Sequence, residues 1–116
     1  MSDELKRIPA VFYRNDNGKE PVRDWLQELE AEDRRKLGKD IATVEYGWPV
    51  GMPLCRSLGG GLWEVRSSLS SSKIARVIFC IAHGRMILLH AFIKKSQKTP
   101  AGDLKIAQER QKEIER

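Results

Sequence analysis

The stretch LWEVRSSLSSSKIARVIFCIAHGRMILLHAFIKKSQK, residues 62–98, decides the fold of this chain. It contains three runs of alternating or β-branched residues, which are Leu62–Leu69, Ile74–Ala82 and Met86–Lys95. The runs are separated only by the short polar segments Ser70–Lys73 and His83–Arg85. Such runs with connections this short are typical of an antiparallel meander. The sequence therefore predicts three consecutive antiparallel strands.

The charge of this stretch is strongly one-sided. Residues 62–98 contain seven Lys or Arg and a single acid, Glu64. The chain carries a net charge of +5, to which residues 1–46 contribute −2, residues 47–98 contribute +7 and residues 99–116 contribute nothing. Arg66 and Arg76 stand in the middle of strands, where a half-buried strand has no need of a charged residue. We therefore expect the sheet to carry a cationic surface for a polyanion.

The N-terminal part of the chain predicts one strand and two helices. Ile8–Arg14 alternates as a strand does and is followed by the turn sequence Asn15–Gly18. Pro21 suits the first turn of a helix, and the apolar residues after it recur at helical spacing, namely Val22, Trp25, Leu26 and Leu29. A second helix is predicted over Glu32–Tyr46. We expect the two helices to form an αα-hairpin over one face of the sheet.

The remaining segments complete a single α+β domain over residues 1–116. Gly47–Gly61 is rich in Gly and Pro and is predicted to be a loop, and it lacks the pattern of a nucleotide-binding phosphate loop. Thr99 and Pro100 form the start of a C-terminal helix whose apolar stripe is thin. Such a helix is expected to dock loosely on the sheet or against a partner. The predicted fold is compact: an antiparallel sheet packed by the N-terminal αα-hairpin, with a C-terminal helix.

Several classes of protein are disfavoured by composition. Cys55 and Cys80 form no CxxC motif, so free thiols are expected, with a disulfide as the alternative. The N-terminus has no apolar segment of a signal peptide, and no apolar run reaches the about 20 residues of a membrane span. We therefore expect a cytoplasmic protein that does not bind a membrane. The two histidines have no second ligand at metal spacing, so no metal and no cofactor are predicted.

Period-two counting assigns the side chains of the third strand to two faces. One face holds Met86, Leu88, His90, Phe92 and Lys94, and the other holds Ile87, Leu89, Ala91, Ile93 and Lys95. The second face is more uniformly aliphatic, so we expect it to meet the helical hairpin. The His90 face would then be open, and Arg66 would lie on it. If Arg76 is on the same side, three adjacent strands contribute Arg66, Arg76 and Lys94 to one patch.

Such a patch suits cleavage of RNA by attack of a ribose 2′-hydroxyl on the neighbouring phosphorus. Charge develops on the phosphate oxygens, and the guanidinium groups of Arg66 and Arg76 match that geometry. His90 is the natural candidate for proton transfer because of its pKa. A lysine whose pKa is depressed by cationic neighbours, such as Lys94, is the alternative. We thus take Arg66, Arg76, Lys94 and His90 as candidate catalytic residues.

Four further residues are candidates for binding RNA. Lys73, Lys95 and Lys98 supply positive charge, and Phe92 offers a face on which a base can stack. Structural interpretations compete with these roles. Arg66 could pair with Glu64 or with an acid on a helix, and Lys94 and Lys95 could be edge charges that discourage aggregation. His90 could equally be a packed, hydrogen-bonded side chain.

The segments LWEVR, ARVIF and AFIKKSQKTP are the most specific parts of a resemblance that covers nearly the whole chain. The sequence resembles the phage-derived HigB-like toxins of the RelE/ParE superfamily. The resemblance implies a compact RelE-like fold with two helices on an antiparallel sheet. Arg66, Arg76, Lys94 and Lys95 match the basic pattern of the family, and Lys98–Pro100 matches its lead into the last helix. A tyrosine near the end of the last strand is absent, so a tyrosine-assisted mechanism is not expected.

The resemblance also implies a function and partners. HigB-like toxins belong to type II toxin–antitoxin modules and act as ribosome-dependent mRNA endonucleases (mRNA interferases) that work without a metal and inhibit translation. The expected partners are mRNA, the ribosome and a cognate helix-turn-helix antitoxin, with which the toxin forms a hetero-oligomeric complex. The superfamily also contains ParE-like toxins that poison a host protein such as DNA gyrase, so fold alone does not settle function. A plain RNA-binding protein that does not cut is a third hypothesis.

Overall fold

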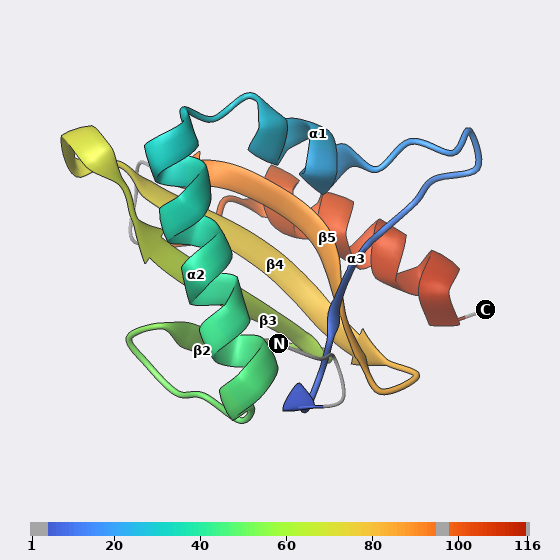
Figure 1. Ribbon diagram of the computed structural model, residues 1–116. Coiled ribbons are helices and arrows are strands. Elements are labelled where there is room, and N and C mark those ends of the chain that lie inside the picture. Colours follow the sequence, from blue (N-terminus) through green and yellow to red (C-terminus); the bar gives the residue numbers. More distant parts are fainter. Residues whose placement is uncertain (1–4, 95–97, 116) are drawn as a thin grey trace.

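The computed structural model describes residues 5–94 and 98–115, and Figure 1 shows it as a sheet with helices on both faces. In chain order the elements are β1 (Ala10–Phe12), α1 (Pro21–Gln27), α2 (Ala31–Gly47), β2 (Cys55–Gly59), β3 (Leu62–Ser68), β4 (Ile74–Ala82), β5 (Arg85–Lys94) and α3 (Ala101–Glu115). The α+β class, the helices and the meander β3–β4–β5 were all expected from the sequence and are confirmed. None of the helices in the described part of the chain is long and apolar enough to cross a bilayer.

The sheet has five strands in the order β1-β5-β4-β3-β2 and is mixed. Its last four strands are antiparallel neighbours, whereas β1 runs parallel to β5, with Ala10 opposite Met86 and Phe12 opposite Leu88. The prediction of a purely antiparallel sheet is therefore wrong. Parallel neighbours need a long crossover connection, and here the chain between β1 and β5 supplies it with two helices and three strands.

The segment Gly47–Gly61 was expected to be a loop, but its second half contains the edge strand β2. Cys55 pairs with Val65 and Ser57 pairs with Trp63, which makes β2–β3 a hairpin. Three consecutive glycines form its turn, with φ values of 85°, 63° and 82° at Gly59, Gly60 and Gly61. Glycine adopts this left-handed conformation without the steric cost that other residues have. The glycines that predicted a flexible loop therefore mark the tight end of a hairpin.

One core lies between the sheet and the two N-terminal helices. α2 crosses β3 and β1, and its Leu37 and Val44 are fully buried against inward residues of the sheet such as Val65, Val77 and Phe79. α1 packs on β5 and β1 instead. The two helices thus cover the same face, as expected, but α2 lies mainly over β3 and α1 mainly over β5, rather than forming a closely paired αα-hairpin.

A second core lies on the opposite face, under α3 (Figure 1). Ala107 of α3 is fully buried in a cluster that includes Leu62, Ile78 and Leu89. Polar contacts add to this docking, because Arg110 donates to the Leu89 carbonyl at 2.7 Å and Gln111 donates to the Gly60 carbonyl at 2.9 Å. The face that the sequence predicts to be open is therefore covered over much of its length. Only the end near the start of α3 carries the cationic residues.

A β-bulge in β5 overturns the period-two assignment of its faces. His90 lies opposite Ile78 and Leu88 lies opposite Phe79, so that Leu89 is an extra residue in the strand. Beyond this point the alternation is reversed, as a bulge requires. Met86 and Leu88 therefore face the same core as Ala91, and Ile87 and Leu89 face the same core as Phe92.

Candidate functional site

The register of the sheet brings the predicted cationic residues together. Arg66 of β3 lies directly opposite Arg76 of β4. Arg76 lies opposite Phe92 of β5, and Lys94 is two residues further along the same strand, opposite Ile74. Residues two apart in a strand share a face. Arg66, Arg76 and Lys94 therefore gather on the face that α3 covers, at the end of the sheet where α3 begins.

A buried carboxylate stands at the centre of this group. Glu64 is completely inaccessible to solvent and forms an ion pair with Arg76, which is 1% exposed. Arg56 of β2 lies 3.6 Å from the same carboxylate, and the hydroxyl of Thr99 donates to its other oxygen at 2.9 Å. Arg56 also donates to the Thr99 hydroxyl at 3.4 Å. Glu64 thus ties together β2, β3, β4 and the segment that leads into α3.

We call Arg56, Glu64, Arg66, Arg76 and Lys94 the cationic cluster. It has four basic groups and one acidic group, so its formal charge is +3. Burial lowers the pKa of Arg76, and the carboxylate of Glu64 opposes that effect. Burial also lowers the pKa of Lys94, which is 8% exposed, and the neighbouring charge of Arg76 lowers it further. Burial and the charge of Arg76 both disfavour the protonated form of the Lys94 side chain.

Arg66 differs from the other members of the cluster. Within residues 5–94 and 98–115, its guanidinium has no hydrogen-bond or ion-pair partner, although its backbone N–H donates to the Leu54 carbonyl at 2.8 Å. The expected alternative, in which Arg66 pairs with Glu64, is wrong because Glu64 is engaged by Arg76 and Arg56. The expectation that Lys94 is an exposed edge charge is also wrong, since Lys94 is buried within the cluster. Lys95 lies outside the described residues.

His90 lies apart from the cationic cluster. Its Nε2 atom is 2.6 Å from the Asp103 carboxylate of α3, and its ring stacks on Phe92 with centroids 5.7 Å apart. Lys94 is four positions further along β5, which is about 13 Å at the usual rise of a strand. The structure therefore places His90 as a packed, hydrogen-bonded side chain between β5 and α3, and Phe92 is partly buried beside it.

The remaining predicted RNA-binding residues are distributed differently. Lys73 lies in the turn between β3 and β4, where its ammonium group is 3.2 Å from the Asp33 carboxylate of α2. Lys98 is exposed immediately before Thr99.

Three members of the site were missed at the level of sequence: Arg56, Glu64 as a central acid, and Thr99 as its hydroxyl partner. Arg56 was hidden because its segment was predicted to be a loop. Glu64 carried a signal, since it is the one acid among seven cations in residues 62–98. Thr99 was assigned only the role of a helix cap.

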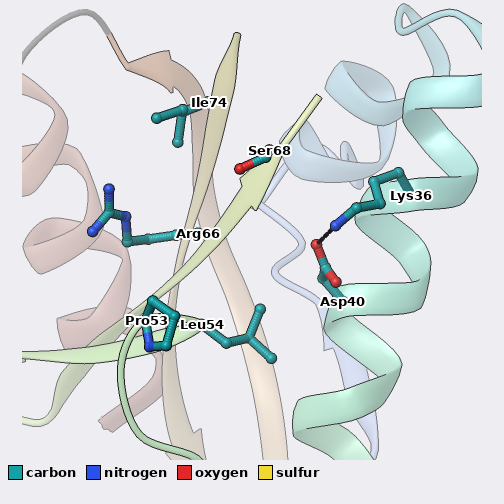
Figure 2. Close-up of a pocket in the computed structure, with 7 residues that line it drawn as sticks. All are labelled: Lys36, Asp40, Pro53, Leu54, Arg66, Ser68 and Ile74. Atoms are coloured by element: carbon teal, nitrogen blue, oxygen red, sulfur yellow. Dashed lines mark hydrogen bonds and ion pairs between the residues drawn. The ribbon is translucent and has the colours of Figure 1, made fainter. Parts of the chain in front are cut away.

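A hollow of about 270 Å³ adjoins the cluster at Arg66 (Figure 2). Its lining residues come from α2, the segment before β2 and the ends of β3 and β4, and they are Lys36, Asp40, Pro53, Leu54, Arg66, Ser68 and Ile74. In Figure 2 the Arg66 side chain extends to the side away from Lys36 and Asp40. Arg66 is therefore shared between the hollow and the cationic cluster.

The arrangement is suited to an anionic substrate. Fixed guanidinium groups in a poorly solvated site stabilise negative charge more strongly than they do in water. Arg66 has donors available to phosphate oxygens, whereas Arg76 and Arg56 act as fixed charges behind it. In the part of the chain that the structure describes, no three His, Cys, Asp or Glu side chains converge as metal ligands.

Comparison with protein families gives one finding that bears on this site. The model of the family described as "Phage derived protein Gp49-like (DUF891)" matches residues 24–112, which run from α1 almost to the end of α3. The matched range includes every member of the cationic cluster and the hollow beside it. A search of curated proteins gives no match.

Proposed function

Because the chain belongs to the phage-derived Gp49-like family, which is a family of RelE/HigB-like toxins, we propose that it cleaves mRNA on the ribosome as the toxin of a type II toxin–antitoxin system. The proposed activity is that of an endoribonuclease that needs no metal. The proposed partners are mRNA, the ribosome and a cognate helix-turn-helix antitoxin that forms a hetero-oligomeric complex with the toxin. All of these would be met in the cytoplasm.

The observation that supports this proposal best is the lack of a partner for the Arg66 guanidinium among the described residues. The other arginines of the cluster are held by Glu64, but the Arg66 guanidinium has no partner among the described residues. Leaving the Arg66 guanidinium without a partner next to the other four members of the cluster, whose net charge is +2, raises the electrostatic energy of the protein. A bound phosphate relieves that repulsion, because a guanidinium binds phosphate oxygens in a bidentate manner.

In the proposed mechanism, the 2′-hydroxyl of a ribose attacks the adjacent phosphorus and the 5′-oxygen leaves. Arg66 binds the non-bridging oxygens, on which negative charge increases in the transition state. Arg76 and Arg56 add fixed positive charge and do not exchange protons. The neutral amine of Lys94 takes the proton of the 2′-hydroxyl, and the ammonium group so formed returns it to the leaving 5′-oxygen, which gives a 2′,3′-cyclic phosphate and a 5′-hydroxyl. Burial and cationic neighbours lower the pKa of Lys94 and thereby favour its neutral form. His90 is not assigned a catalytic role, since it is paired with Asp103 away from the cluster.

Primer extension on a reporter mRNA in a reconstituted translation system tests the proposal. Wild type is compared with Arg66→Ala and with Arg85→Ala, each with and without ribosomes. Arg85 is a suitable control because it is an exposed arginine at the opposite end of β5. We expect new 5′ ends only with ribosomes, and a loss of about 10²- to 10³-fold in rate for Arg66→Ala, the effect of removing one charge-stabilising donor. Arg85→Ala should cut at the wild-type rate.

Two results would contradict the proposal. Equal cleavage by Arg66→Ala and wild type would remove Arg66 from the site. An intact message in every lane would reject the nuclease activity and favour the ParE-like alternative, for which inhibition of DNA gyrase supercoiling is the next assay. Circular dichroism of each variant must match wild type for the comparison to hold.

Lys94→Arg separates the charge of this side chain from its capacity to transfer a proton. The substitution keeps the positive charge but removes the titratable amine, because an arginine does not lose its proton in a protein. We expect cleavage to be slower by about 10²-fold or more, the usual size of a general acid–base contribution. Single-turnover rates between pH 5.5 and 9 supply the check. An unchanged rate and pH profile in Lys94→Arg would show that another group transfers the proton.

A further inference from the structure

The hollow beside Arg66 lies where the pairing of β2 with β3 stops. The last pair is Cys55 with Val65, and beyond it only the Leu54 carbonyl still accepts a bond from the Arg66 N–H. The chain before β2 turns away at this point and α2 passes on the other side, as Figure 2 shows. The volume of about 270 Å³ suits a single planar ring system better than a large ligand.

The lining of the hollow combines apolar walls with a few polar groups. Pro53, Leu54 and Ile74 provide aliphatic surface, on which the face of a ring can pack. Lys36, Asp40 and Ser68 provide donors and acceptors on the side of α2 and β3. Such a combination fixes the orientation of a bound ring by its polar edge.

Hydrogen bonds from the described residues reach only one oxygen of the Asp40 carboxylate. Its Oδ2 atom accepts from the Lys36 ammonium at 2.6 Å and from the Ser67 hydroxyl at 2.6 Å. Among the described residues, its Oδ1 atom has no hydrogen-bond partner, and a carboxylate has about four acceptor sites in total. The edge of the hollow therefore presents an acceptor that an amino group can satisfy.

We propose that this hollow is a nucleobase subsite that takes a base with an exocyclic amino group. The base packs on Leu54 and Ile74, its amino group donates to Asp40, and the attached phosphate lies at the Arg66 guanidinium. Uracil is disfavoured, because it has no exocyclic amino group and carries carbonyl oxygens at both C2 and C4, which the carboxylate would repel. This inference rests on the proposed function and specifies which nucleotide is held next to the cleaved phosphate.

Binding of single nucleotides to the full chain tests the subsite without any cleavage. Chemical-shift titrations use the four nucleoside 5′-monophosphates, with ribose 5-phosphate as a probe that lacks a base. We expect the adenine, cytosine or guanine nucleotide that fits best to bind at least about tenfold more tightly than ribose 5-phosphate and uridine monophosphate. Asp40→Asn should reduce this preference by about fivefold or more. Asp24→Asn, an exposed acid of α1 that does not line the hollow, should leave it unchanged.

The same variants, mapped for cleavage positions on ribosome-bound mRNA, separate the two proposals. If wild type cuts mRNA but all nucleotides bind no better than ribose 5-phosphate, the subsite is rejected and the nuclease proposal stands. If uridine monophosphate binds as well as the others, the role of Asp40 is rejected. If nucleotides bind in a base-dependent manner but no message is cut, the nuclease proposal fails while the subsite is upheld as a binding site.

Discussion

Glu64 is the residue on which the cationic cluster depends. It is buried with Arg76, and burying two charges costs several kcal/mol per ion before their mutual attraction is counted. The Nε atoms of Arg56 and Arg76 are also buried without a hydrogen-bond partner in the described part of the chain. A well-packed apolar group would fill this space with a smaller cost in folding free energy. The arrangement is therefore better explained by the need to hold positive charge in place beside Arg66 than by stability.

Replacing Glu64 by Gln tests whether the ion pair holds the cluster. The change keeps the shape of the side chain but leaves the Arg76 charge buried and uncompensated. We expect the free energy of unfolding to fall by about 3–5 kcal/mol. Urea denaturation measures the difference, with Glu28→Gln as a control at an exposed glutamate of the α1 C-terminus. The control should change stability by no more than about 0.5 kcal/mol. Equal stability of the two variants would show that Glu64 does not organise the cluster.

At the scale of elements, the sequence predicted what depends on local pattern and missed what depends on distant partners. β4 was predicted over Ile74–Ala82 and has these bounds, because short turns fix both of its ends. The bulge at Leu89 was missed, since nothing in the alternation of β5 marks it, and the faces of Met86 to Leu89, which precede the shift in register, were therefore assigned wrongly. The parallel pairing of β1 with β5 joins segments that are far apart in the chain, so it leaves no local signal.

The same difference between local pattern and distant pairing explains which residues of the site were predicted and which were missed. The sequence predicted that Arg66 and Arg76 would share one patch if Arg76 faced the same side, and the structure puts them opposite each other on neighbouring strands. Arg56 was missed because β2 becomes a strand only through its pairing with β3. The pairing of His90 with Asp103 was missed as well, because it depends on how α3 lies on the sheet.

The turn between β3 and β4 is fixed to α2 by one carboxylate. Asp33 is 2% exposed and accepts from the Ser70 backbone N–H at 2.9 Å, from the Ser70 hydroxyl at 3.0 Å and from Lys73 at 3.2 Å. The Ser70 backbone bond, followed by the hydroxyl and by Lys73, lowers the pKa of Asp33 from its usual value of 3.8. Lys73, proposed from sequence as an RNA contact, therefore has a structural partner in this turn.

Asp33→Asn should destabilise the protein in a pH-dependent manner. The folded protein holds Asp33 with a pKa below 3.8, so the ionised carboxylate stabilises the fold at all pH values above 3.8. This contribution is lost as the pH falls through the lowered pKa of the folded state. The difference in unfolding free energy between wild type and Asp33→Asn should thus be constant from pH 7 to 5 and shrink below pH 4.

Urea denaturation at pH 7, 5, 3.5 and 2.5 measures this difference. Asp24→Asn serves as the control, because Asp24 is an exposed acid on α1. A difference for Asp33→Asn that does not decrease in acid would mean that the carboxylate charge has no part in fixing the turn.

At the scale of the whole molecule, the excess of positive charge lies in the segment that contains strands β2 to β5. Residues 47–98, which contain the four strands β2 to β5, carry a net charge of +7, whereas residues 1–46, with α1 and α2, carry −2. Within the sheet, the cationic cluster lies at the end where α3 begins, and Arg85 lies at the opposite end. A polyanion should therefore bind at one end of the sheet.

The salt dependence of RNA binding tests whether the cluster is where the polyanion binds. Each phosphate neutralised on a single strand contributes about −0.7 to the slope of log K against log salt concentration. Arg66→Ala should therefore make the slope shallower by about 0.7, because it removes one phosphate contact. Arg85→Ala removes the same charge from the protein and should leave the slope unchanged. Fluorescence anisotropy with a labelled single-stranded RNA between 50 and 200 mM salt gives both slopes. Equal changes in the two variants would mean that RNA responds to the net charge of the protein, and that the cluster is not a localised site.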